Sequence, residues 1–228
     1  MCSNYRDATI PNRQSQIDPA HRPDDEHANF VTHGIGLILA LVGSGYLLWF
    51  VAPHYPSRTI AACVTYCVSL VGLFAASTLS HTFVSLEWRR FFRTADQCCI
   101  FLYIAGAFTP FGVVFLWYDW WPLLLAAMWL LALLGVALVL HMRDLTPRAK
   151  VTYGFLGWLP VISLKVFYDA APVTMLAWIL AGGAFYSIGT IFLCYDRRVR
   201  FFHALWHTFV IAGTACHYIA IVAFVLQR

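Results

Sequence analysis

The chain has 228 residues, of which 61% are hydrophobic and only 11% are charged. Soluble globular domains carry roughly 25% charged residues, so this composition excludes an ordinary soluble enzyme and indicates an integral membrane protein. The net charge of +4 comes from basic residues spread over several loops, without a long basic run, so we expect no nucleic-acid partner.

Seven apolar runs are long enough to cross a bilayer as helices, which takes about 20 residues each. They cover 29–52, 58–84, 94–117, 121–142, 150–168, 172–194 and 201–226. The short loops between them predict an all-α membrane protein, a seven-transmembrane helix bundle that fills residues 29–228 as one domain. Residues 1–28 are polar and lack the apolar core of a secretory signal, so we expect them to form a cytoplasmic tail.

The distribution of Lys and Arg predicts the orientation, because short cytoplasmic loops carry an excess of positive charge. Of the fifteen basic residues, twelve lie in the tail or in the loops after spans two, four and six. The other three are Arg58, Lys165 and Arg228. We therefore expect the amino terminus in the cytoplasm and the carboxyl terminus outside.

Several ionisable side chains fall within the expected spans, where such residues are costly and usually functional. They are His33, His81, Asp96, His203, His207 and His217. A helix rise of 1.5 Å per residue places four of them within roughly 10 Å of the cytoplasmic boundary. These four, on three helices, are His81, Asp96, His203 and His207. His217 lies about 21 Å beyond His203 along its helix, too far to join them. It is either a packed, hydrogen-bonded residue or part of a proton or substrate path.

The histidine spacing in the last span is typical of a metal site. His203 and His207 are four residues apart and share a helix face, so one helix offers two imidazoles to one ion. His81 would supply a third nitrogen and leave a position for water. Three histidines plus water is the pattern of a catalytic zinc site, so we expect Zn2+ as the cofactor. Ser77 lies one turn before His81 on the same face.

Four motifs resemble landmarks of a known family. They are "EHANFVTHGIG", "STLSH", "ADQCCIFLYIAGAFTP" and "HALWHTFVIAGTACHY". In order and position they are similar to the hemolysin III branch of the progestin and adiponectin receptor (PAQR) family, and the resemblance covers essentially residues 26 to 220. One departure is Ser80, where the family often has an aromatic residue before the histidine of the second helix. That departure concerns the shape of the pocket and leaves the ligands intact.

The resemblance implies a zinc ion near the inner face of the bundle, held by the residues that match His81, His203 and His207. It further implies that an aspartate matching Asp96 contacts the metal through water and that the serine matching Ser77 lies nearby. The family groups with alkaline ceramidases in a wider set of membrane hydrolases, and adiponectin receptors are associated with ceramide hydrolysis. The short tail and loops favour the compact bacterial-type branch, which would place the protein in the inner cell membrane of a bacterium.

Three functions are compatible with these features. The leading hypothesis is a zinc-dependent hydrolase of a lipid amide or ester at the cytoplasmic leaflet, with Asp96 as general base through water and Ser77 orienting a ligand or stabilising the oxyanion. The second is a non-catalytic membrane sensor or regulator in which zinc clamps helices together. The third is the pore-forming cytolysin that the hemolysin name suggests, although the outer halves of the spans are poor in polar residues. A membrane lipid is the expected substrate or ligand, and the sequence indicates no oligomeric state.

Two further residues belong to the same inner layer. His33, about one turn into the first span, is either a partner that orients a ligand or an interfacial histidine that binds headgroups. Glu26 is interpreted as an acid at a helix amino terminus, where it favours the helix dipole. The glycines in "GIGLILALVGSG" and "GGAFYSIG" predict close contacts between helices.

Overall fold

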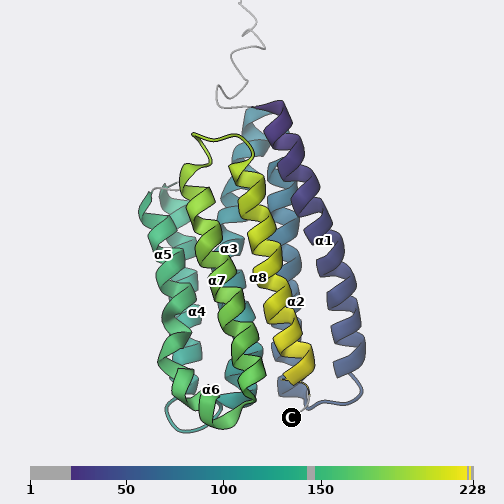
Figure 1. Cartoon of the computed structure of the whole chain (residues 1–228), viewed down its shortest axis with the longest axis vertical. Helices are drawn as coiled ribbons and strands as arrows, with labels where there is room; N and C mark the ends of the chain where they lie inside the picture. The colour runs from purple at the N-terminus through teal and green to yellow at the C-terminus, as the bar shows by residue number, and fades with distance from the viewer. Residues whose placement is uncertain (1–21, 143–146, 225, 227–228) are drawn as a thin grey trace, which may run out of the picture.

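The computed structural model describes residues 22–142, 147–224 and 226, and this part of the chain is a bundle of helices without a strand (Figure 1). It contains seven helical segments long and apolar enough to cross a membrane, which confirms the predicted fold class. The six that are single helices are α1 (Pro23–Val51), α2 (Ser57–Ser80), α3 (Leu86–Phe115), α4 (Pro122–Met142), α7 (Val173–Tyr195) and α8 (Phe202–Phe224). Residues 1–21 of the expected tail lie outside the described residues.

Three helix ends differ from the predicted spans. α1 begins at Pro23 rather than at residue 29, because proline suits a first helical turn and the three acidic residues after it complement the helix dipole. α3 begins at Leu86 rather than at residue 94, so its polar first turns are helical as well. An apolar run marks only the part of a helix that suits lipid, and both helices extend beyond it. α2 ends at Ser80, so His81 follows the helix as its cap instead of lying within it.

The fifth span, expected as one helix over 150–168, is broken into three pieces. They are α5 (Pro147–Trp158), the 3-10 helix η2 (Leu159–Ser163) and α6 (Leu164–Ala170). Pro160 lies in the first turn of η2, where its ring has no N–H to donate and crowds the preceding turn. Val151–Ala170 still qualifies as one membrane-length segment, so the span was predicted correctly and its continuity was not.

α3 is the central helix of the bundle. It packs mainly against α2 and α4, with further contacts to α5, α6 and α8, whereas α1 packs on α2 and α8, and α7 on α8. In α3, 67% of the most apolar window is buried, compared with 28% in α1, whose outer side faces lipid. Side chains on the inner faces of α2, α3 and α8 therefore point toward a common interior.

Glycines mark two of the closest helix contacts, as predicted. Gly36 on α1 lies against the ring of Phe74 on α2, and Gly182 on α7 lies against the ring of His217 on α8. A Cβ atom at position 182 would come within 2.6 Å of that imidazole. A larger residue at either position would force the two helices apart.

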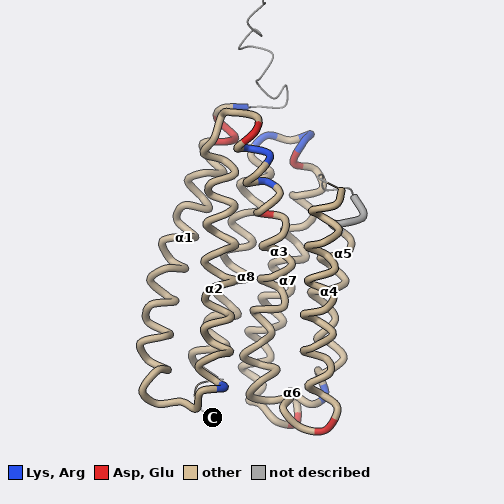
Figure 2. The backbone as a smooth tube through the Cα atoms, turned by 180° about the vertical axis from the view of Figure 1, so that it is seen from behind, with Lys and Arg blue, Asp and Glu red and all other residues tan. Residues whose placement is uncertain are grey.

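Charged residues gather at one end of the bundle, the end at which α1 begins (Figure 2). The described basic residues there follow α2 and α7 or precede α1. Arg58, in the first turn of α2, and Lys165, in α6, lie at the other end of the bundle (Figure 2). This distribution matches the alternation on which the predicted orientation rests. The cytoplasmic placement of the amino terminus stays a prediction.

Candidate metal centre

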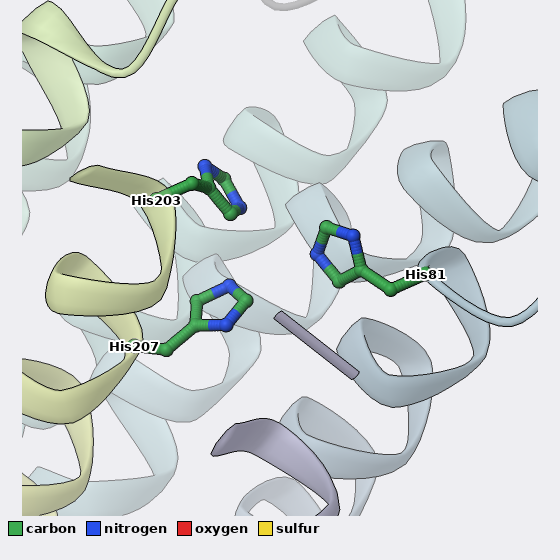
Figure 3. A group of neighbouring side chains, drawn as sticks. All are labelled: His81, His203 and His207. Carbon is green, nitrogen blue, oxygen red and sulfur yellow. The ribbon is translucent and has the colours of Figure 1, made fainter. Parts of the chain in front are cut away.

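Three histidines from two distant parts of the sequence meet near the charged end of the bundle. His81 caps the carboxyl end of α2, and His203 and His207 lie one turn apart in the first turns of α8. One nitrogen from each ring lies within 4.8 Å of the nitrogens of the other two, and Figure 3 shows the rings facing one another. The ring centroid of His81 is 5.2 Å from that of His203 and 5.2 Å from that of His207. The centroids of His203 and His207 are 4.5 Å apart. The group is thus compact enough to share one ion.

Each of the three imidazoles is held at Nδ1 by an oxygen atom. For His81 the partner is Glu26 Oε2 at 2.6 Å, and for His203 it is Asp196 Oδ2 at 2.9 Å. Carboxylates only accept hydrogen bonds, so both rings donate from Nδ1. The Nδ1 atom of His207 lies 3.1 Å from Thr32 Oγ1, whose own proton goes to a backbone carbonyl of α1. These bonds fix the ring orientations, and Nε2 of His81, which has no hydrogen-bond partner among the described residues, is available to a ligand.

Ser77 and Asp96 lie deeper in the bundle than His81. Ser77 is one turn before the end of α2, is 1% exposed and lies beside Asp96 on α3. Its hydroxyl faces the carboxyl group of Asp96 within hydrogen-bonding reach. Asp96 is half-buried and lies within electrostatic reach of His203. The structure therefore brings both predicted residues to the neighbourhood of the three histidines.

His33 is a buried neighbour of the group and not an exposed interfacial histidine. Its ring stacks on that of His207 with a centroid distance of 3.5 Å, and its edge meets Phe74 at 5.2 Å. It is 3% exposed, and neither ring nitrogen has a hydrogen-bond partner in the described part of the chain. Asn29 lies one turn earlier on α1 and is 4% exposed. Its Oδ1 also has no hydrogen-bond partner in the described part of the chain.

His217 lies apart from this group, as its position along α8 predicts. Its Nε2 lies 3.3 Å from the carbonyl oxygen of Ile179, and its ring packs against Tyr186 at a centroid distance of 5.5 Å. Of the two interpretations, the structure agrees with a packed residue that is hydrogen-bonded within the bundle.

Sequence reasoning missed three residues that hold the imidazoles. Glu26 was interpreted only through the helix dipole, but its carboxylate also contacts His81 and Arg89. Asp196 comes just after the expected sixth span, and it precedes His203 by seven residues across the turn between α7 and α8. Thr32 lies in a motif that was noted without a role. The signal that could have identified Asp196 is an acidic residue in the short connection that precedes the helix with the histidine pair.

Seven membrane-length helices and a three-histidine group near one end define a multi-pass membrane protein with a possible metal site inside the bundle. Comparison with known proteins identifies the family. A family model described as Haemolysin-III related matches residues 21–218, so the chain belongs to the haemolysin III-related family.

Individual relatives agree with this assignment. Hemolysin-3 of Bacillus cereus is 32% identical over 203 residues, which is 89% of this chain and 92% of that protein. A Hemolysin-3 homolog of Bacillus subtilis (strain 168) is 29% identical, covering 89% of this chain and 95% of that protein. The Adiponectin receptor protein of Drosophila melanogaster is 23% identical over 96% of this chain and 55% of its own length. These similarities confirm the expected relation to the progestin and adiponectin receptor family.

Proposed function

We propose that this protein is a zinc-dependent hydrolase that acts on a lipid amide or ester at the cytoplasmic leaflet. The observation that supports it best is the set of three convergent imidazoles, His81, His203 and His207, each anchored at Nδ1 by an oxygen atom. Neutral imidazoles suit zinc, and three protein ligands leave a coordination position for water, as in catalytic sites.

The donor set fits such an ion. Nε2 of His81 is buried and has no hydrogen-bond partner among the described residues. A buried nitrogen without a partner carries an uncompensated desolvation cost, which a metal ion would remove. Zinc, when bound, would polarise a carbonyl group and supply a reactive water near neutral pH.

Two residues of the chain are assigned to the chemistry. Asp96 would accept a proton from the attacking water and return it to the leaving nitrogen or oxygen of the lipid. The hydroxyl of Ser77, buried beside Asp96, would donate a hydrogen bond to the carbonyl oxygen as negative charge develops there. Asn29 and His33 would hold another polar group of the bound lipid, because buried polar atoms nearly always have a partner.

An open surface pocket beside His81 supports a substrate from the membrane. It has a volume of about 320 Å³ and lies between the start of α1 and the turn that follows α2. Its lining consists of Pro23, Glu26, His27, Phe30, His81, Thr82 and Val84. Phe30 and Val84, two of its apolar members, are 40% and 60% exposed, whereas Glu26 and His81 are largely buried. An apolar mouth with a polar floor suits a lipid that places its headgroup linkage near His81.

The proposal is tested with purified protein in vesicles that contain an N-acyl lipid or an ester lipid. We expect the wild type to release fatty acid, measured by mass spectrometry. Asp96→Asn should lower turnover at least about 100-fold, the usual contribution of a general base, while bound zinc stays the same. Equal turnover by this variant would contradict the assigned mechanism.

A second candidate is a non-catalytic sensor or regulator in which zinc is structural. One observation favours it, since the metal ligands would join the end of α2 to α8, which are far apart in the sequence. In that case chelation would lower the melting temperature of the protein, and no lipid product would form under any condition in the same vesicles.

A further inference from the structure

Glu26 makes contacts that a role in the helix dipole does not explain. Oε2 accepts a hydrogen bond from His81, Oε1 accepts one from the guanidinium of Arg89, and Arg93 lies 3.6 Å from Oε1. The carboxylate is 13% exposed and the side chain of Arg89 only 3%. A charged pair this deeply buried is costly unless both members are well bonded, so its position is tightly specified.

The turn of α1 that carries Glu26 is also tied to the other side of the candidate metal centre. Arg200, in the turn before α8, pairs with Asp24 at 2.9 Å and with Asp25 at 3.5 Å. Arg22 donates to the carbonyl oxygen of Arg197 at 2.7 Å. The first turns of α1 therefore bridge two separate elements, the one with His81 and the one with His203 and His207.

His81 depends on such a bridge more than the other two histidines do. His203 and His207 are placed by the rigid backbone of α8, whereas His81 follows the last residue of α2, where the chain turns toward α3. Its ring orientation is set by the bond from Nδ1 to Glu26. The same bond places the proton on Nδ1, so that the lone pair of Nε2 is free for a metal ion.

We propose that Glu26 is a positioning residue that couples metal binding to the docking of the first turns of α1. The inference rests on the proposed zinc site. Arg89 holds the carboxylate, the carboxylate orients His81, and His81 completes the ligand set. Because coupling between two events is reciprocal, zinc must stabilise docked α1 to the same extent that docked α1 strengthens zinc binding.

The first test measures zinc affinity by competition with a coloured chelator. Glu26→Ala would take a charged partner from the buried Arg89, so it is combined with Arg89→Leu, which removes the buried charge. We expect this double variant to remain folded and to bind zinc roughly 10- to 100-fold more weakly than the wild type, the usual cost of losing such a partner. Glu26→Gln, which keeps an acceptor for His81, should show a smaller loss. Glu87→Gln, which changes an exposed carboxylate in the first turn of α3, serves as the control and should bind zinc normally.

The second test measures hydrogen exchange with and without zinc. In the wild type we expect amides in residues 23–33 to become more protected when zinc is added, and in the double variant this gain should vanish. The inference is overturned if the double variant binds zinc as tightly as the wild type, or if the zinc-dependent protection persists in the double variant. A wild type that binds no zinc would instead overturn the proposed function together with this inference.

Discussion

At the scale of single residues, the candidate metal centre combines imidazoles that are bonded to the protein at Nδ1 with buried polar groups that have no partner among the described residues. The imidazoles of His81, His203 and His207 use Nδ1 for contacts to the protein. His33 and Asn29 are buried beside them, and both His33 nitrogens and Asn29 Oδ1 have no hydrogen-bond partner in the described part of the chain. Buried groups of this kind reduce stability, and their presence in one place indicates that they serve a ligand.

Replacing Ser77 tests its assigned contact with the reacting carbonyl. Ser77→Ala should lower turnover about 100-fold, as expected when one oxyanion donor is lost, without changing zinc content. Ser44→Ala is the matched control, because that serine is also buried but lies on α1, about three turns beyond His33. Equal effects of the two substitutions on lipid hydrolysis would remove Ser77 from the mechanism.

Replacing His33 separates stability from function. His33→Phe keeps a ring to stack on His207 and removes two unpartnered nitrogens, so the free energy of unfolding should rise by about 1–3 kcal/mol. Turnover should fall, because the variant loses hydrogen bonds to the bound lipid. Thermal unfolding and mass spectrometry measure the two effects, and a destabilised variant with full activity would refute both parts.

Single residues also show which contacts of the site can be predicted from the sequence and which cannot. The pair His203 and His207 could be predicted, because the period of a helix relates positions four apart. The partners Glu26 and Thr32 could not, since their contacts join residues 55 and 175 positions apart, and no local rule connects them. Such contacts depend on how α1 packs against α2 and α8.

At the scale of helices, hydropathy located the spans but not their ends. α3 starts well before its apolar run, and Pro160 breaks the fifth span inside an apolar run. The helix ends are set by capping and by proline geometry, which a hydropathy average does not register. The displaced end of α2 matters most for function, because it makes His81 a residue of a turn.

The contact between α7 and α8 can be tested with a single methyl group. Gly182→Ala would place a Cβ atom within 2.6 Å of the His217 ring, so we expect a loss of about 1–3 kcal/mol in stability from overpacking. Gly45→Ala, on α1 with no atom within 4 Å of the added Cβ, is the control and should be neutral or slightly stabilising. Thermal unfolding in detergent distinguishes them, and a neutral Gly182→Ala would show that the helices are not closely packed there.

At the scale of the whole molecule, the bilayer made the fold predictable. Lipid requires long apolar helices with internally satisfied backbone, so the composition alone excludes most other architectures. The charged residues gather at the end where α1 begins (Figure 2). This asymmetry is expected because the two ends of the bundle lie at different faces of the membrane. The candidate metal centre lies near this charged end, which the predicted orientation makes cytoplasmic.

The orientation is tested with reporter fusions at both ends of the chain. A reporter that is active only in the cytoplasm should work when it is fused to Met1 and fail when it is fused to Arg228, because the positive loops stay inside. The opposite pattern would move the histidine group to the outer leaflet and would rule out a substrate from the cytoplasmic leaflet.

The most direct test of the metal centre is the metal content of the purified protein. Wild-type protein should contain roughly one zinc ion per chain, the stoichiometry of a site with three histidine ligands. The double variant His203→Ala, His207→Ala should contain none, whereas His217→Ala should keep its zinc. Metal that persists in the double variant, or a metal-free wild type after purification with added zinc, would contradict a zinc site formed by His81, His203 and His207.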